Sequence, residues 1–206
     1  MPALDKKKLY LIGFVFMPRH MVKNFDKFMP IMCKDMAHLR YPANGSLFGY
    51  AMINAAGHIE LPIVGMILAC EDASSWNVCD TTLTAVIPGA DDEKVAITGD
   101  GQKGELASHK NGFRKGLLRS CYRHRLDEYK GTGANVLLAK RAYQVGVFCR
   151  KTDAIAKVMT ALKRRSPAAY AKVMNVPLAR QFPAYAIEAG YGPLRGRNTS
   201  NLIEVR

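Results

Sequence analysis

The chain has 206 residues, of which 49% are hydrophobic and 23% are charged. This composition is typical of a folded globular protein and excludes a disordered one. The formal net charge of +13 is concentrated in one half, because residues 1–103 carry a net charge of −1 and residues 104–206 a net charge of +14; this asymmetry predicts a polyanionic partner.

The first half of the chain predicts one helix and several strands. Residues 9–17 are apolar and end at Pro18, which predicts a buried strand. Apolar side chains then recur at three- and four-residue steps over residues 26–40, which predicts an amphipathic helix. Strands are expected on both sides of Ala56-Gly57 within residues 46–70, and again over residues 81–87 and 94–98.

The second half predicts more helix. We expect a helix over residues 111–130 and strands over residues 135–139 and 143–150. Thr152 is predicted to cap a helix with Ile155, Met159 and Leu162 on one face, together with Val158. Ser166 followed by Pro167 predicts a second helix over residues 168–174.

The predicted fold class is α+β. It has a central, mostly antiparallel sheet, an N-terminal amphipathic helix and a helix-rich, basic C-terminal half. The sequence shows no repeat and no linker, so we expect a single domain over residues 1–206, ending in a basic, loop-rich tail at residues 191–206.

The most prominent functional feature is a basic block at residues 110–165, with 15 Lys and Arg against 3 Asp and Glu. On the predicted helix 111–130, four of its cations would share about one quarter of the helix circumference. Arginine suits phosphate oxygens because its planar fork donates several hydrogen bonds. The residues predicted to bind nucleic acid or anionic lipid are Lys110, Arg114, Lys115, Arg119, Arg123, Arg125, Lys130, Arg150, Lys151, Lys163, Arg164, Arg165, Arg195 and Arg197.

No catalytic, cofactor or metal signature is present. The sequence contains no GxSxG elbow, Walker loop or HExxH pair, and the CxxH pair at Cys121 and His124 lacks a second pair at ligand spacing. The acidic run Asp91-Asp92-Glu93 suggests a solvated turn more than a nuclease site. The GxxG sequence at residues 101–104 is interpreted as a hairpin turn. We therefore predict no catalytic residue, no metal and no cofactor.

The cysteines and the N-terminus indicate the compartment. There are 5 cysteines with no CxxC pair, which is typical of free thiols in a reducing environment. The apolar run at residues 9–17 is too short to span a bilayer and lacks a small-residue cleavage site. We expect an intracellular protein, cytoplasmic or nuclear.

The order of predicted elements resembles that of the matrix proteins of rhabdovirus-like negative-strand RNA viruses. The corresponding segments are residues 8–17, 24–39, 46–55 and 143–162. The resemblance implies a virion protein that binds nucleocapsid and an anionic inner membrane, self-associates and catalyses nothing.

These observations predict a non-enzymatic structural or assembly protein that binds a polyanion through the basic block. Nucleic acid, with RNA favoured, and an anionic membrane surface are the expected partners, and a homo-oligomer is compatible with both. Two alternatives remain open: a cellular or ribosome-associated RNA-binding protein, and a nucleic-acid-processing enzyme.

Overall fold

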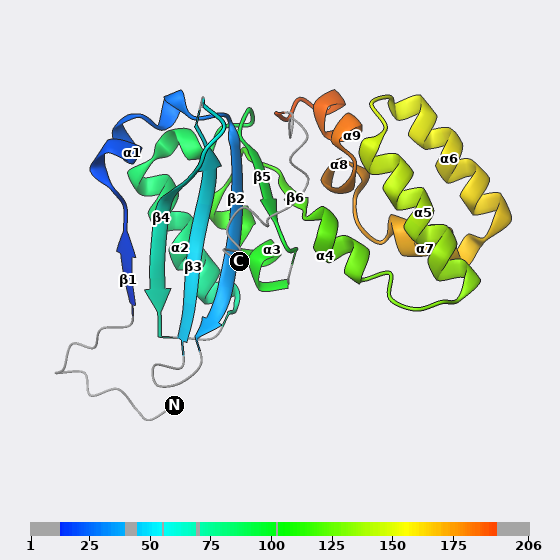
Figure 1. The fold of residues 1–206 in the computed structure, drawn as a ribbon, viewed down its shortest axis with the longest axis horizontal. Coiled ribbons are helices and arrows are strands. Elements are labelled where there is room, and N and C mark those ends of the chain that lie inside the picture. Colours follow the sequence, from blue (N-terminus) through cyan, green and yellow to red (C-terminus); the bar gives the residue numbers. More distant parts are fainter. Residues whose placement is uncertain (1–12, 40–44, 55, 69–70, 102, 193–206) are drawn as a thin grey trace.

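A computed structural model describes residues 13–39, 45–54, 56–68, 71–101 and 103–192. Within these ranges the chain forms one mostly antiparallel sheet and two groups of helices, so the predicted α+β class is confirmed (Figure 1). The predicted tail falls almost wholly outside the described residues, as do Arg195 and Arg197.

The sheet has six strands in the order β1-β4-β3-β2-β5-β6. Strands β1 to β4 pair antiparallel, whereas β5 pairs parallel with both β2 and β6. The strands are β1 (Gly13–Phe16), β2 (Ile31–Leu39), β3 (Gly45–Ile53), β4 (Ile59–Ile67), β5 (Ala96–Gly99) and β6 (Leu118–Ser120).

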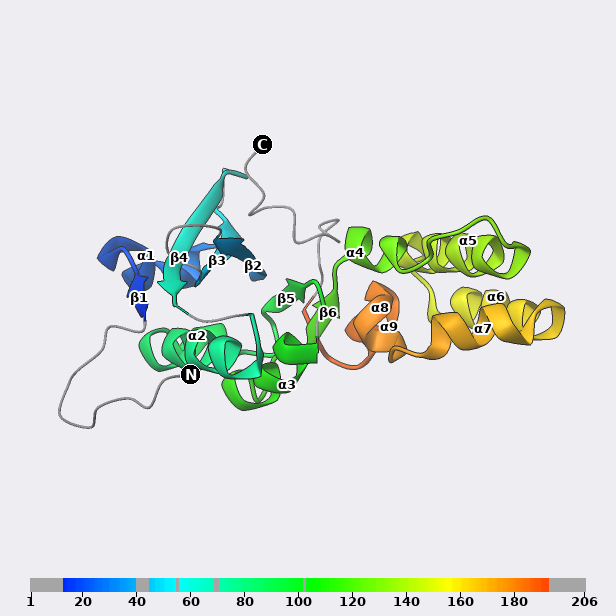
Figure 2. The ribbon, with the colours of Figure 1, turned by 90° about the horizontal axis from the view of Figure 1, so that it is seen from below.

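One face of the sheet is covered by helices α2 (Ala73–Val86) and α3 (Lys103–Gly112), which lie side by side beneath it (Figure 2). Short helical segments lie between the strands: α1 (Arg19–Lys23), η1 (Phe25–Lys27) and η2 (Pro88–Ala90). Met32, Trp76 and Leu83 are among the buried side chains of this first core. Burial of this surface is what holds the helical layer on the sheet.

The remaining helices form a second group with its own core, which includes Tyr143, Ile155 and Phe182. Its members are α4 (Tyr122–Asp127), α5 (Ala134–Phe148), α6 (Thr152–Arg165), α7 (Pro167–Met174), α8 (Leu178–Gln181) and α9 (Pro183–Glu188). The group connects to the sheet through α8, where the Arg180 Nε donates to the carbonyl oxygen of Leu118 at 2.8 Å. The single domain predicted for residues 1–206 stays a prediction.

Several predicted elements are confirmed. Strands β3 and β4 lie on either side of the Ala56-Gly57 turn, and β5 overlaps the strand predicted at residues 94–98. Helix α6 buries Ile155, Met159 and Leu162 as expected. The Ser166 hydroxyl accepts a hydrogen bond from the Ala169 amide at 3.1 Å, so it caps α7.

The helix predicted over residues 26–40 is wrong, because residues 31–39 form β2. This strand lies in the interior of the sheet between β3 and β5, and Ile31, Met32, Cys33 and Lys34 are all buried. A strand buried on both faces carries apolar side chains on both. That pattern imitates the spacing of a helix.

The strand predicted over residues 81–87 is also wrong, since residues 73–86 form α2. The Asp72 side chain caps this helix by accepting from the Ser75 amide at 2.8 Å. Trp76, Cys79 and Leu83 are buried at three- and four-residue steps. The helical pattern therefore begins before the Thr-rich segment that suggested a strand.

The helix predicted over residues 111–130 is replaced by the end of α3, a loop, β6 and α4. A β-carbon on Gly112 would lie 2.3 Å from the Cβ of Asp80, so glycine permits α3 to pack closely against α2. The hairpin turn predicted at residues 101–104 is also wrong, because Gly101 has φ of 83° and leads into α3.

The strands predicted over residues 135–139 and 143–150 are wrong as well, because both fall in or beside α5. Its buried residues are Ala139, Ala142, Tyr143, Gly146 and Val147, which recur at helical spacing. A β-carbon on Gly146 would lie 2.5 Å from the Phe182 ring, so this glycine is a packing position within the helix.

Candidate functional site

Ten of the fourteen basic residues predicted to bind a polyanion have exposed side chains. They are spread over α3, α4, α6 and the connecting loops, so they do not form one face of one helix. The exposed residues are Lys110, Arg114, Lys115, Arg123, Lys130, Arg150, Lys151, Lys163, Arg164 and Arg165.

Arg119 is buried, which contradicts the surface role predicted for it. The residue lies in β6, is only 2% exposed, and its Nη2 donates to the carbonyl oxygen of Gly192. Burial lowers the pKa of its guanidinium to about 10. Arg119 therefore ties the end of the described chain to the sheet.

Arg125 is also buried and contradicts the same prediction. Its side chain is 2% exposed and donates from α4 to Gln181, to the Lys172 carbonyl oxygen at 3.1 Å and to Asn175. It also pairs with Glu128. These contacts join α4 to α7 and α8, so Arg125 is a structural residue.

Two carboxylates that the sequence analysis did not single out lie near the point where the parallel pairing of β2 with β5 stops. Strand β2 pairs with β5 in a register that matches Cys33 with Thr98. Asp35, which lies within β2, and Asp100, which directly follows β5, each come two residues after this last matched pair. Open sheets bind ligands in the crevice beyond the carboxyl ends of such strands. The next parallel strand, β6, ends beside them, and the Cys121 amide donates to Gly99 O at 2.7 Å.

A third carboxylate, Glu71, lies within electrostatic range of both aspartates. Burial raises its pKa, and the negative charges of Asp100 and Asp35 raise it further, although the Trp76 ring N–H and His38 lower it. The Trp76 Nε1 donates to Glu71 at 3.1 Å, and the His38 Nε2 lies 3.8 Å from its other oxygen. We call Asp35, Glu71 and Asp100 the acidic site.

His124 borders the acidic site from α4. Burial alone would lower the pKa of its imidazole, but Cys121, Asp100 and Asp35 raise it above the usual value. His124 therefore holds a proton more readily than a free histidine does.

A buried polar network supports the acidic site from below. The Lys34 Nζ, on β2, donates to both oxygens of Asp80 at 2.9 and 3.1 Å and lies 3.9 Å from Glu105. The Tyr50 and Ser108 hydroxyls donate to Asp80 at 2.6 and 3.1 Å. All five side chains are excluded from solvent. The network therefore joins β2, β3, α2 and α3 and is closed to solvent.

Glu105 connects this network to the loop that carries Asp100. It accepts from the Gly101 amide at 2.7 Å, and its Oε1 would lie 1.6 Å from a β-carbon on Gly99. Burial raises the pKa of Glu105, Lys34 lowers it, and Asp100 raises it. Gly99 and Glu105 together fix the path of the chain at Asp100.

The chemistry of the acidic site fits a hard divalent cation. Among the residues that the structure describes, no group of three or more His, Cys, Asp or Glu side chains is arranged to hold a metal ion. Magnesium, however, commonly uses one or two carboxylates, keeps several waters and completes its shell with substrate phosphates. Asp35 and Asp100 are two carboxylates of the kind that magnesium uses.

No protein-family model matches this chain, and no curated protein is detectably similar to it. The resemblance to viral matrix proteins stays a prediction, and the segment at residues 24–39 that it treats as a helix contains strand β2. Within the described ranges, the helices are all too short or too polar to cross a membrane.

Proposed function

We propose that this protein is a nucleic-acid-processing enzyme that acts on phosphodiester bonds at the acidic site. The observation that carries the proposal is that Asp35 in β2 and Asp100 just after β5 each come two residues after Cys33 and Thr98, the last matched pair of these parallel strands. The net charge of +13 supports it, because a nucleic-acid substrate carries one negative charge per phosphate.

The exposed cations account for substrate binding. Three exposed cations lie at or just after the end of α3: Lys110, Arg114 and Lys115. A fourth, Arg123, lies on α4, which begins directly after Cys121, the residue that follows β6. Salt bridges and hydrogen bonds to phosphates position a strand without reading its sequence. This surface holds the backbone of RNA or DNA.

The acidic site accounts for the chemistry. Asp35 and Asp100 hold a divalent cation, which when bound polarises a phosphodiester and activates water. The Asp35 carboxylate is oriented by the Met36 amide, which donates to it at 2.9 Å. Asp100 is oriented by the loop that Glu105 fixes. His124 keeps a proton beside the site for the leaving oxygen.

Turnover of labelled RNA and DNA with Mg²⁺ or Mn²⁺ tests this proposal. We expect Asp35→Asn and Asp100→Asn each to lower the rate by at least about a hundred-fold, because each removes a cation ligand. The matched control is Asp153→Asn, which makes the same change at an exposed position on α6. Turnover that survives both substitutions would overturn the proposal.

One outcome would favour the non-enzymatic assembly function predicted from the composition. If the wild type binds nucleic acid or phosphatidylserine vesicles tightly but shows no turnover with either cation, the ten exposed cations alone would carry the function. Concentration-dependent oligomers would then support a matrix-like role.

A further inference from the structure

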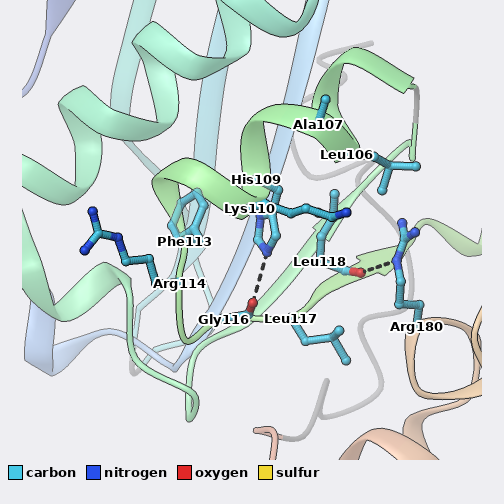
Figure 3. A pocket seen from close by; sticks show the side chains of 10 residues that line it. All are labelled: Leu106, Ala107, His109, Lys110, Phe113, Arg114, Gly116, Leu117, Leu118 and Arg180. Carbon is cyan, nitrogen blue, oxygen red and sulfur yellow. Dashed lines mark hydrogen bonds between the residues drawn. The ribbon is translucent and has the colours of Figure 1, made fainter.

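A pocket of about 550 Å³ lies between the end of α3, the loop at residues 113–117, the start of β6, and α8 (Figure 3). Ligand pockets in proteins have volumes of about 300–1,000 Å³. Its apolar lining comes from Leu106, Phe113, Leu117 and Leu118. The pocket is therefore large enough for a nucleotide and has an apolar wall for a base.

The polar lining of this pocket is basic. Lys110, Arg114 and Arg180 line it, and no aspartate or glutamate is among its described lining residues. In Figure 3, the Lys110 and Arg180 side chains both reach toward the Leu118 side of the pocket, whereas Arg114 points the other way. Two cations on one side of an apolar pocket favour an anionic group there.

Hydrogen bonds fix the walls of the pocket. The His109 ring lies 3.0 Å from the Gly116 carbonyl oxygen, and burial lowers the pKa of His109 to about 4, so its ring is neutral near pH 7. The Asp91 carboxylate accepts from the Lys115 and Gly116 amides at 2.8 and 3.2 Å. Because its walls are held in this way, the pocket is preformed and binding costs little ordering.

Arg180 connects the pocket with the acidic site. Its Nε donates to the Leu118 carbonyl oxygen, and its Nη2 lies 3.8 Å from the place a β-carbon on Gly101 would occupy. Gly101 directly follows Asp100. Glu105 also lies within electrostatic range of Arg180, but burial raises the pKa of Glu105 and weakens it as a counter-ion.

We infer that this pocket binds one nucleotide of the nucleic-acid strand. Its phosphate lies between Lys110 and Arg180, and its base lies against the apolar lining of the pocket. The identity of the ligand rests on the proposed function. The strand then runs from the pocket past Arg180 to the scissile phosphate at Asp35 and Asp100. The pocket sets the position of cleavage relative to a nucleotide that is out of the stack.

Calorimetric titration with deoxyadenosine 5′-monophosphate in EDTA tests the inference without metal or turnover. Ala107→Trp fills the pocket from the exposed face of α3, and Lys110→Ala removes a cation. We expect each to weaken binding at least about ten-fold, a free-energy change of about 1.4 kcal/mol. Lys157→Ala, an exposed lysine on α6 outside the pocket lining, is the control and should bind as the wild type does.

Deoxyadenosine and inorganic phosphate serve as half-ligands, and each should bind at least about ten-fold more weakly than the nucleotide. Equal binding of the nucleotide by Ala107→Trp, equal binding of phosphate alone, or no binding by the wild type would overturn the inference. The Asp35→Asn, Asp100→Asn double variant should bind the nucleotide normally. Failure of the enzymatic proposal thus shows in turnover, and failure of the pocket shows in this titration.

Discussion

Replacing Lys34 with methionine tests the buried network beneath the acidic site. Lys34 lies 2.9 Å from Asp80, 3.9 Å from Glu105 and 4.8 Å from the centre of the Trp76 ring, all away from solvent. Methionine has a similar volume, so the change removes the positive charge without opening a large cavity. Asp80 would then be a buried carboxylate bonded only to hydroxyl groups.

The expected cost follows from the burial of both partners. Removing one member of a buried ion pair lowers the free energy of unfolding by about 3–5 kcal/mol, since it leaves an uncompensated charge. For a chain of this length each kcal/mol lowers Tm by roughly 2–4 °C. We therefore expect Lys34→Met to lower Tm by about 6–20 °C.

Urea denaturation and thermal melting followed by circular dichroism measure this cost. Lys110→Met removes an exposed lysine from α3 and should change stability by less than about 0.5 kcal/mol. The double variant Lys34→Met, Asp80→Asn removes both charges, so it should be more stable than Lys34→Met by about 1–3 kcal/mol. A loss below about 1 kcal/mol for Lys34→Met, or a double variant no more stable than Lys34→Met, would refute the reasoning.

Three further predictions concern residues around the two cores. Arg125→Met should lower the free energy of unfolding by about 3 kcal/mol, because Arg125 is buried among its partners. The control Arg150→Met, at an exposed site, should lower it by less than about 0.5 kcal/mol, and urea denaturation measures both. Gly99→Ala should lower Tm and cost about 1–3 kcal/mol, because the added carbon collides with Glu105. The unfolded state protonates His109 below about pH 6.5, whereas the folded state does so only near pH 4. His109 therefore makes the free energy of unfolding decrease as the pH is lowered from about 6.5 to about 4. His109→Gln should reduce this slope, and identical pH–stability slopes would contradict the assignment.

The sequence alone predicted those elements whose start or buried face is determined by residues close together in the chain. The Ser166-Pro167 pair predicted the start of α7, and the apolar face of α6 predicted its burial. Residues 31–39 misled the prediction because an interior strand is apolar on both faces. Gly112 and Gly146 are required by contacts with Asp80 and Phe182, and those partners are distant in sequence.

The acidic site could not be predicted for a similar reason. Asp35 and Asp100 come to the same end of the β2–β5 pairing only because β5 adds to β2 in parallel, whereas the predicted sheet was mostly antiparallel. The acidic run that the sequence analysis considered lies at residues 91–93. In the structure, the Asp91 carboxylate accepts a hydrogen bond from the Lys115 amide and so fixes that loop. The exposed cations were predictable from composition, but the burial of Arg119 and Arg125 depends on tertiary contacts.

Manganese binding, followed by the electron paramagnetic resonance signal of the free ion, tests most directly whether Asp35 and Asp100 form one cation site. We expect the wild type and Asp153→Asn to bind Mn²⁺ alike, and the Asp35→Asn, Asp100→Asn double variant to bind it at least about ten-fold more weakly. Equal Mn²⁺ affinity in the wild type and the double variant would contradict the assignment of the acidic site.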